Sequence, residues 1–284
     1  EVVIDDYGML ARVEDVSGSS PLRLARYDAL MGDFPQARLW QLTGTQYVLT
    51  QREEIYVPGE IVARLPAPGA DGGEAAPSLI YRLSDDHPRA WIVTSIRTAD
   101  DNAALPLLGD LSLNLAETAL LPPMVNGSGR PIGLEDGQLA SPGTNEVVVT
   151  QIAPGELQIH VNSERGGYLV VSENWLPGWQ ARMHAAGRWT TVPVLRTNLT
   201  FLGLRVYAGE QTVELRYRPA SVRGGLLISG LTVLLVAGAL VLQRVRATLR
   251  GRDQHLPGHD RNLPGLGDLG GFTAPAARHP IRRD

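Results

Sequence analysis

Apolar and polar residues alternate along most of residues 145–219, as they do in strands that bury one face. Turn signals such as Pro-Gly, Gly-Gly and Ala-Gly separate the alternating segments. Short strands at roughly ten-residue spacing predict an antiparallel β-sandwich over residues 144–219. The expected strands cover 146–152, 156–161, 168–173, 189–195, 200–206 and 211–217.

The region before this one mixes helical and strand periodicities. Residues 1–121 therefore predict a mixed α/β domain, and the Gly- and Pro-rich residues 122–143 predict a linker between the two domains. The fold class expected for the whole chain is α+β. The expected strands of this first domain cover 46–50, 55–65, 79–83, 90–96 and 119–121.

Three helices are expected in the first domain. The first runs from Pro21 to Met31, with Ser19 or Ser20 as its cap, because proline favours the first position of a helix. The second is short, at Leu39 to Leu42, and ends at Gly44. The third is a capped helix over 100–108.

A continuous apolar run from Gly224 to Leu242 carries no charge and no proline. At a rise of about 1.5 Å per residue it reaches about 28 Å, close to the hydrocarbon thickness of a bilayer. A buried core helix is the alternative, but such helices are usually shorter and apolar on one stripe only. The run therefore predicts a transmembrane helix over residues 224–243.

Arginine flanks this run on both sides, with Arg244, Arg246, Arg250 and Arg252 after it and Arg216, Arg218 and Arg223 before it. The excess after the run places the C-terminal end in the cytoplasm and the large N-terminal region outside it. Residues 244–284 are rich in Gly and Pro and predict a disordered cytoplasmic tail. The spacing of the tail histidines fits no metal-ligand pattern.

Composition narrows the function classes. The 284-residue chain has a net charge of −4 and no cysteine, which excludes disulfides, thiolate metal sites and cysteine nucleophiles. No basic face interleaved with aromatics is present, so nucleic acid is not expected as a partner. The chain opens at Glu1 without a signal peptide and is expected to be a piece of a longer polypeptide.

Two stretches are candidate binding sites. A polar loop with Asp15 and Ser17 leads into the first expected helix, which carries Arg23 and Arg26, and it could present N–H groups and guanidinium groups to an anion such as phosphate. An ordinary helix cap and turn is the alternative. Further along, Trp175 and Trp179 flank the turn at 177–178. They could stack on a sugar, or they could plug the sandwich core with their N–H groups bonded to carbonyls.

The run VVSENWLPGWQARM, followed by VPVLRTNLTFLGLRVYAGEQTVELRYRP and an apolar span, resembles the C-terminal end of YfhO-type bacterial membrane proteins. Residues 15–27, 39–51 and 88–93 are similar to three further segments of that family, in the same order. The chain departs from the pattern at 185–187, where Ala-Ala-Gly replaces the usual Asp-Gly, and at 210–211, where a His is common.

The resemblance implies a function. YfhO-type proteins look like polytopic glycosyltransferases of the GT-C kind, which take a sugar from a polyprenyl-phosphate carrier. Their catalytic acid lies in a membrane-embedded module that would precede Glu1, so no catalytic residue is expected in this chain. The chain would be the extracytoplasmic accessory portion, with the lipid bilayer, the upstream module and cell-envelope glycan as partners and with no cofactor or metal.

A different class of function is also open. A β-sandwich with a mixed α/β partner, anchored by one helix, could bind envelope glycan or protein without catalysis. The sequence upstream of Glu1 would separate the two hypotheses, since the transferase needs several hydrophobic segments and an anchored binding module needs a signal peptide.

Overall fold

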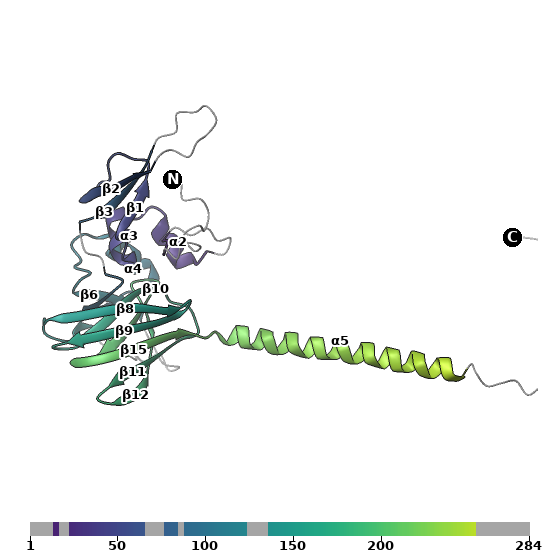
Figure 1. Ribbon diagram of the computed structural model, residues 1–284. Coiled ribbons are helices and arrows are strands. Elements are labelled where there is room, and N and C mark those ends of the chain that lie inside the picture. The colour runs from purple at the N-terminus through teal and green to yellow at the C-terminus, as the bar shows by residue number, and fades with distance from the viewer. Residues whose placement is uncertain (1–13, 17–22, 66–76, 85–87, 124–135, 254–284) are drawn as a thin grey trace, which may run out of the picture. The chain divides into compact units, whose positions relative to one another are not determined.

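The computed structural model describes residues 14–16, 23–65, 77–84, 88–123 and 136–253 (Figure 1). Residues 1–223 belong to one compact unit, and residues from Gly224 onward form a second unit. Helices and largely antiparallel sheets give the first unit an α+β fold that contains a β-sandwich, as the sequence predicts.

One layer of the sandwich is a five-stranded antiparallel sheet, which we name the outer sheet. The inward positions of its strands alternate with outward positions, so that Leu157, Ile159 and Val161 are buried while Gln158 and His160 are not. In spatial order its strands are β12 (Arg188–Val192), β11 (Trp179–Ala185), β15 (Gly209–Tyr217), β9 (Glu156–Ser163) and β8 (Asn145–Ala153).

The facing layer is a four-stranded sheet, which we name the central sheet. Leu169 and Val171 of its third strand pack against Ile159, Met183 and Val213 of the outer sheet in the main hydrophobic core. In spatial order its strands are β13 (Leu195–Thr197), β14 (Phe201–Val206), β10 (Gly167–Asn174) and β4 (Ala90–Val93).

The far face of the central sheet is covered as well. Tyr168 and Val170, which alternate with the residues of the main core, pack with Ile96 and Ala119 of a three-stranded sheet in a second core. Its strands are β6 (Thr118–Leu121), β5 (Ser95–Thr98) and β7 (Gly137–Gln138), and the β5–β6 pair is parallel.

A third core joins the helices to the sheets. Leu30, Leu42 and Leu108 pack there with Leu120 and Phe201. The helices are α2 (Ala25–Met31), α3 (Gln36–Thr43) and α4 (Asp101–Gly109). Another three-stranded sheet, named the tip sheet, follows α3 in the chain, with β1 (Tyr47–Thr50), β3 (Ser78–Leu83) and β2 (Gly59–Leu65) in spatial order.

The expected helices are present, but two of them begin elsewhere than predicted, and α3 starts at Gln36 rather than at Leu39. Asp100 caps α4 by accepting a hydrogen bond from the backbone N–H of Ala103, and α3 ends at Gly44 in the left-handed conformation. The predicted start of the first helix is wrong. Helix α2 begins at Ala25, and its N-cap Leu24 offers no side-chain hydrogen bond.

Several predicted strands are shorter in the structure, either because a proline interrupts them or because the chain passes from one sheet to another. Proline cannot donate to a ladder, and Pro193 accordingly separates β12 from β13 where one strand over 189–195 was predicted. Likewise β2 starts only after Pro58. The predicted strand 90–96 divides at Thr94 into β4 and β5, which belong to different sheets.

Hydrogen bonding crosses the predicted boundary between the two globular domains. Strand β4, from the predicted α/β domain, pairs along its length with β10 of the predicted sandwich domain. Part of the predicted linker 122–143 lies outside the described residues, and its described part contains β7, which pairs with β5. The region before the predicted linker and the region after it therefore contribute strands to the same sheet.

The apolar run forms one helix, α5 (Ala220–Asp253), which extends beyond the predicted end at residue 243. Residues Ala220–Arg246 are long and apolar enough to cross a membrane, and none of the most apolar window of this helix is buried against protein. The predicted tail from residue 254 onward lies outside the described residues.

The turn between β13 and β14 supports a test of the fold. Asn198 is fully buried and adopts φ 46°, and its Oδ1 accepts from the backbone N–H of Leu120 at 2.8 Å. Replacing Asn198 with Ala would leave that N–H unpaired and would force alanine into a left-handed conformation. We expect Asn198→Ala to lower the free energy of unfolding by about 2–4 kcal/mol.

Urea unfolding of the whole chain in a nonionic detergent, followed by tryptophan fluorescence, measures this change. Asn198→Gly is the matched control. It loses the same hydrogen bond but tolerates the backbone conformation, so its loss should be smaller by about 1 kcal/mol. Equal losses in the two variants would show that the left-handed backbone contributes nothing.

Candidate functional site

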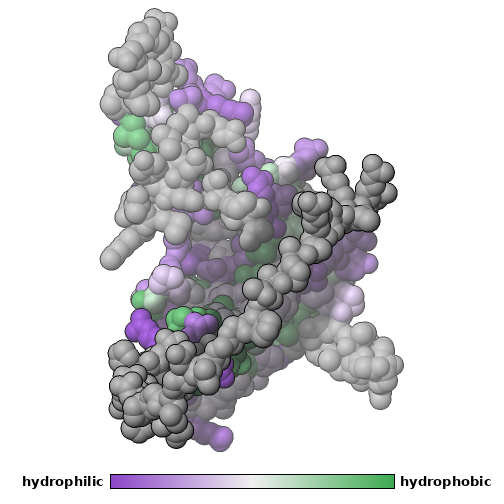
Figure 2. All heavy atoms as spheres, turned by 90° about the vertical axis from the view of Figure 1, so that its right-hand side faces the viewer, coloured by the Kyte–Doolittle hydropathy of each residue, from purple (hydrophilic) through white to green (hydrophobic). Residues whose placement is uncertain are grey.

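Hydrophilic and hydrophobic residues are mixed over the part of the surface visible in Figure 2, so hydropathy alone does not single out a binding surface. The pairing of the strands gives a clearer guide, because it shows which side chains lie next to one another on the surface. Residues directly opposite each other in an antiparallel ladder share a face, so the pairing of the outer sheet defines which side chains line up on its solvent side.

Two rows of side chains cross this solvent face from strand to strand. In the first row Trp189 lies opposite His184, His184 opposite Thr212, and Thr212 opposite His160. The second row consists of Thr191, Arg182, Glu214 and Gln158. We name these eight residues the Trp189 face.

Trp189 is the aromatic centre of this face, since its side chain is 40% exposed. The His184 ring lies against it at a centroid distance of 5.0 Å, and the Arg182 guanidinium carbon lies 5.1 Å from the indole centroid. A cation at that distance from an indole is attracted to the ring. These two neighbours hold the indole on the surface with part of its ring open to solvent.

The turn that connects β11 and β12 places Trp189 opposite His184. Ala185 pairs with Arg188, which leaves a two-residue loop, and both loop residues have positive φ, 49° at Ala186 and 75° at Gly187. This is the geometry of a type I′ hairpin, which matches the twist of the strands. Alanine is unusual in the first position because of its Cβ, and the position is the one where the sequence departs from the Asp-Gly pattern.

Hydrogen-bonding groups surround the aromatic centre. His160 Nδ1 lies 3.2 Å from Thr212 Oγ1, and Glu214 Oε2 lies 3.5 Å from Arg216 Nη2. Arg182 and Glu214 stand opposite each other in the second row, so the face carries both signs of charge. An open indole among neutral and balanced polar groups can stack on an apolar ring face while the surrounding groups bond to hydroxyls.

The tryptophans singled out in the sequence lie elsewhere. Trp175 and Trp179 are partly buried and pack against the main core. Trp179 donates its Nε1–H to the Asn174 carbonyl at 3.1 Å, and its ring contacts Tyr217 at a centroid distance of 5.5 Å. The packing matches the alternative in which these indoles plug the sandwich.

The turn between Trp175 and Trp179 packs closely against the backbone at Pro219. Gly178 has φ 122°, and a Cβ there would lie 2.7 Å from Cα of Pro219, the residue before α5. Only glycine fits this approach of one backbone to another.

The predicted anion-binding residues are engaged in ion pairs or lie outside the described residues. Arg23 pairs with Asp28 at 2.9 Å on the exposed surface. Arg26 pairs through Nε with Asp101 at 2.7 Å. Ser17 lies outside the described residues, and Asp15 lies in the short described segment before it. The partners of Arg23 and Arg26 are therefore carboxylates of the helices and not Trp175 or Trp179.

Asp101 accepts from two arginines and links α2 to the central sheet. Arg196 of β13, whose side chain is 15% exposed, binds the second carboxylate oxygen at 2.6 Å. Burial alone would raise the pKa of Asp101, but the hydrogen bonds and charges of Arg26 and Arg196 outweigh it and hold the pKa below the ordinary 3.8.

A second charged cluster surrounds Arg89. Arg89 pairs with Glu14 and with Glu173, the latter at 3.2 Å. Burial raises the pKa of Glu173 even though Arg89 opposes the shift. Nearby, burial and then the charges of Asp15 and Glu173 raise the pKa of Tyr27 to about 12, so its hydroxyl stays protonated and donates to the Val16 carbonyl. The cluster ties residues 14–16 to the sandwich.

Among the described residues no group of three or more His, Asp or Glu side chains could hold a metal ion. No family model matches the sequence, and comparison with curated proteins and with solved structures found no match. The assignment of function therefore depends on the surface chemistry of the chain itself, and the YfhO-type resemblance stays a hypothesis.

The Asp101 pairs give a pH-dependent prediction. A depressed pKa means that the ionised carboxylate stabilises the folded state above the ordinary pKa, and this stability is lost as pH falls through the depressed value. We expect Asp101→Asn to lower the free energy of unfolding by about 1 kcal/mol at pH 7, since it leaves Arg196 without its carboxylate. The deficit should shrink as the pH is lowered below 4.

Urea unfolding at several pH values measures the difference between the variant and the parent. Asp28→Asn is the control, because its pair with Arg23 is solvent-exposed and should change stability by less than about 0.5 kcal/mol. A deficit that is the same at low and neutral pH would contradict the electrostatic explanation.

Proposed function

We propose that this chain is the extracytoplasmic binding portion of a membrane-anchored protein of the bacterial cell envelope, and that the Trp189 face binds a neutral oligosaccharide. The row from Trp189 to His160 carries the proposal. It combines an open indole with imidazole and hydroxyl groups, and the adjacent second row adds amide, carboxylate and guanidinium groups on the same rigid sheet surface.

The dimensions of the face suit a short chain of sugars. From β12 to β9 there are three interstrand steps, which at about 4.8 Å each give a path of about 14 Å across the strands. Hydroxyl groups along such a ligand would meet Arg182 and Glu214 in the adjacent row. The face carries both signs of charge, since Glu214 stands opposite Arg182 and pairs with Arg216, and such groups can bond to the hydroxyls of an uncharged ligand.

The anchor is the other part of the proposal. Helix α5 is long and apolar enough to cross a bilayer, and arginines are more numerous after the apolar run than before it. This charge bias supports a cytoplasmic C-terminus and an external sandwich. A binding face held near the membrane in this way would keep the protein close to envelope glycan.

The glycosyltransferase hypothesis remains a second proposal, in which the same face would hold the acceptor glycan for a polyprenyl-phosphate-dependent module preceding Glu1. The two proposals share the sugar-binding surface and differ in the upstream sequence. Several hydrophobic segments in the same reading frame would favour the transferase, and a signal peptide would favour the binding module.

Removing the indole tests the sugar-binding proposal. We expect Trp189→Ala to weaken the binding of short neutral oligosaccharides at least tenfold, because truncating a tryptophan that anchors a ligand costs about 2 kcal/mol or more. Titration calorimetry of the whole chain in nonionic detergent, against a panel of hexose and N-acetylhexosamine oligomers, measures the change.

Tyr56→Ala is the matched control, since Tyr56 is an 88% exposed aromatic outside the Trp189 face and its removal should leave affinity within twofold. Arg182→Met should also weaken binding, because it removes both the cation beside the indole and a donor in the second row. If no sugar on the panel binds, or if both tyrosine and tryptophan variants lose affinity equally, the Trp189 face is not a sugar site.

The absence of cysteine makes the membrane topology easy to test. Single cysteines are introduced at Ala103, which is exposed on α4, and at Thr273, in the predicted tail. In intact cells a membrane-impermeant maleimide should label Ala103→Cys, whereas Thr273→Cys should react only after permeabilisation. The reverse pattern would place the sandwich in the cytoplasm and would remove the envelope from the proposal.

A further inference from the structure

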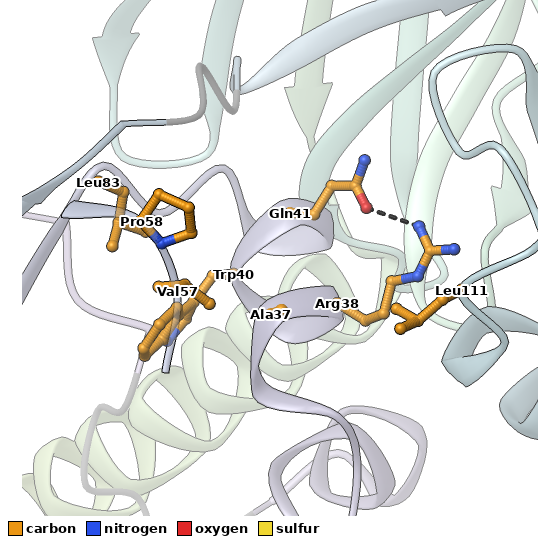
Figure 3. Close-up of a pocket in the computed structure, with 8 residues that line it drawn as sticks. All are labelled: Ala37, Arg38, Trp40, Gln41, Val57, Pro58, Leu83 and Leu111. Atoms are coloured by element: carbon orange, nitrogen blue, oxygen red, sulfur yellow. Dashed lines mark hydrogen bonds between the residues drawn. The ribbon is translucent and has the colours of Figure 1, made fainter. Parts of the chain in front are cut away.

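A groove beside α3 lies outside the Trp189 face. It has a volume of about 200 Å³ and is bounded by α3, by the end of β3, by the residues just before β2 and by Leu111 after α4 (Figure 3). Most of its lining residues are apolar, with Trp40, Val57, Pro58 and Leu83 at one end, although polar atoms of Arg38 and Gln41 also line it. An apolar pocket with a few placed polar groups is the usual form of a small-molecule site.

The polar groups come from Arg38 and Gln41, one turn apart on the helix. Arg38 is only 6% exposed, yet none of the described carboxylates lies within ion-pairing distance of its guanidinium. Its Nη1 donates to Gln41 Oε1 at 2.7 Å, and its Nη2 donates to the carbonyls of Asp110 and Leu113 at 2.6 Å each. These partners are neutral acceptors. The carboxylate of Asp110 acts on Arg38 electrostatically but forms no ion pair with it, so among the described residues the buried guanidinium has no carboxylate in direct contact.

Two donors remain for a ligand. Arg38 Nε is buried and has no hydrogen-bond partner. Because Gln41 Oε1 accepts from Arg38, the Gln41 amide nitrogen is left as a donor, and no described residue accepts from it. A buried donor without a partner costs free energy, and a buried cation costs more unless an anion compensates it. The groove thus lacks an anionic acceptor on its polar side.

We propose that the α3 groove binds a small monocarboxylate with a compact apolar body, the carboxylate accepting from Arg38 and Gln41 and the body lying against Trp40. The volume sets the size of the body, since a cavity of about 150 Å³ holds benzene. The two oxygens of a carboxylate can accept one hydrogen bond from Arg38 Nε and one from the Gln41 amide. This inference is independent of the sugar-binding proposal, because it concerns other residues and another class of ligand.

The test uses 4-fluorobenzoate, with its neutral analogue 4-fluorobenzamide, followed by fluorine NMR of the whole chain in nonionic detergent. The benzoate should bind saturably and at least tenfold more tightly than the benzamide. Equal affinities would show that the buried charge selects nothing. Absence of saturable benzoate binding would overturn the proposal.

Gln41→Glu is the decisive variant. It gives Arg38 the carboxylate that the groove lacks, so the melting temperature should stay the same or rise, while benzoate affinity should fall at least tenfold. Ala37→Leu, which fills the groove from an exposed helix position, should also weaken binding tenfold. Ala103→Leu is its control on α4 and should leave affinity within twofold. Retained affinity in Gln41→Glu would show that the ligand does not use Arg38.

Discussion

The burial of strand β10 on both faces is the constraint on which the rest of the unit depends. Its residues alternate between two cores, with Leu169 and Val171 facing the outer sheet and Tyr168 and Val170 facing the opposite side. Its two edges are occupied by β14 and β4. A strand enclosed in this way leaves no freedom of register, because a slip by one residue would exchange the contents of the two cores.

The two proposed binding surfaces follow from what this central layer leaves uncovered. The outer sheet buries one face against the central sheet, so its other face is free to carry the polar and aromatic rows around Trp189. The helices cover the third core with their apolar residues, and the polar positions Arg38 and Gln41 of α3 remain beside the tip sheet. Rigid packing underneath each surface keeps its polar groups in place without a ligand.

Local pattern in the sequence was enough for most elements. Period-two alternation identified β8, β9, β10, β14 and β15 but not β11, Asp100 marked the start of α4, and Gly44 marked the end of α3. The sequence did not show which distant strands pair with each other. Nothing local in Ala-Trp-Ile-Val at 90–93 indicates that this strand joins β10, since an apolar run fits any buried layer.

The candidate surfaces were harder to predict for a related reason. Trp175 and Trp179 flank a conspicuous turn, yet both pack against the core, whereas Trp189 lies on a strand that looked ordinary. The alternation Arg182, His184 before the Ala-Gly turn and Trp189, Thr191 after it was the available signal, and it acquires meaning only once the register across the turn is known. The burial of Arg38 without an ion pair could not be inferred at all, because burial and the lack of a described carboxylate within ion-pairing distance are properties of the folded chain.

The pairing of Val93 with Tyr168 also has a consequence for how the protein is made. During synthesis β4 emerges long before β10. The chain between them forms α4, β5, β6 and β7 and also β8 and β9 of the outer sheet. The apolar strand β4 therefore stays unpaired until β10 has left the ribosome. Contacts between such distant segments fold slowly, and this interval is when a chaperone would matter most to the chain.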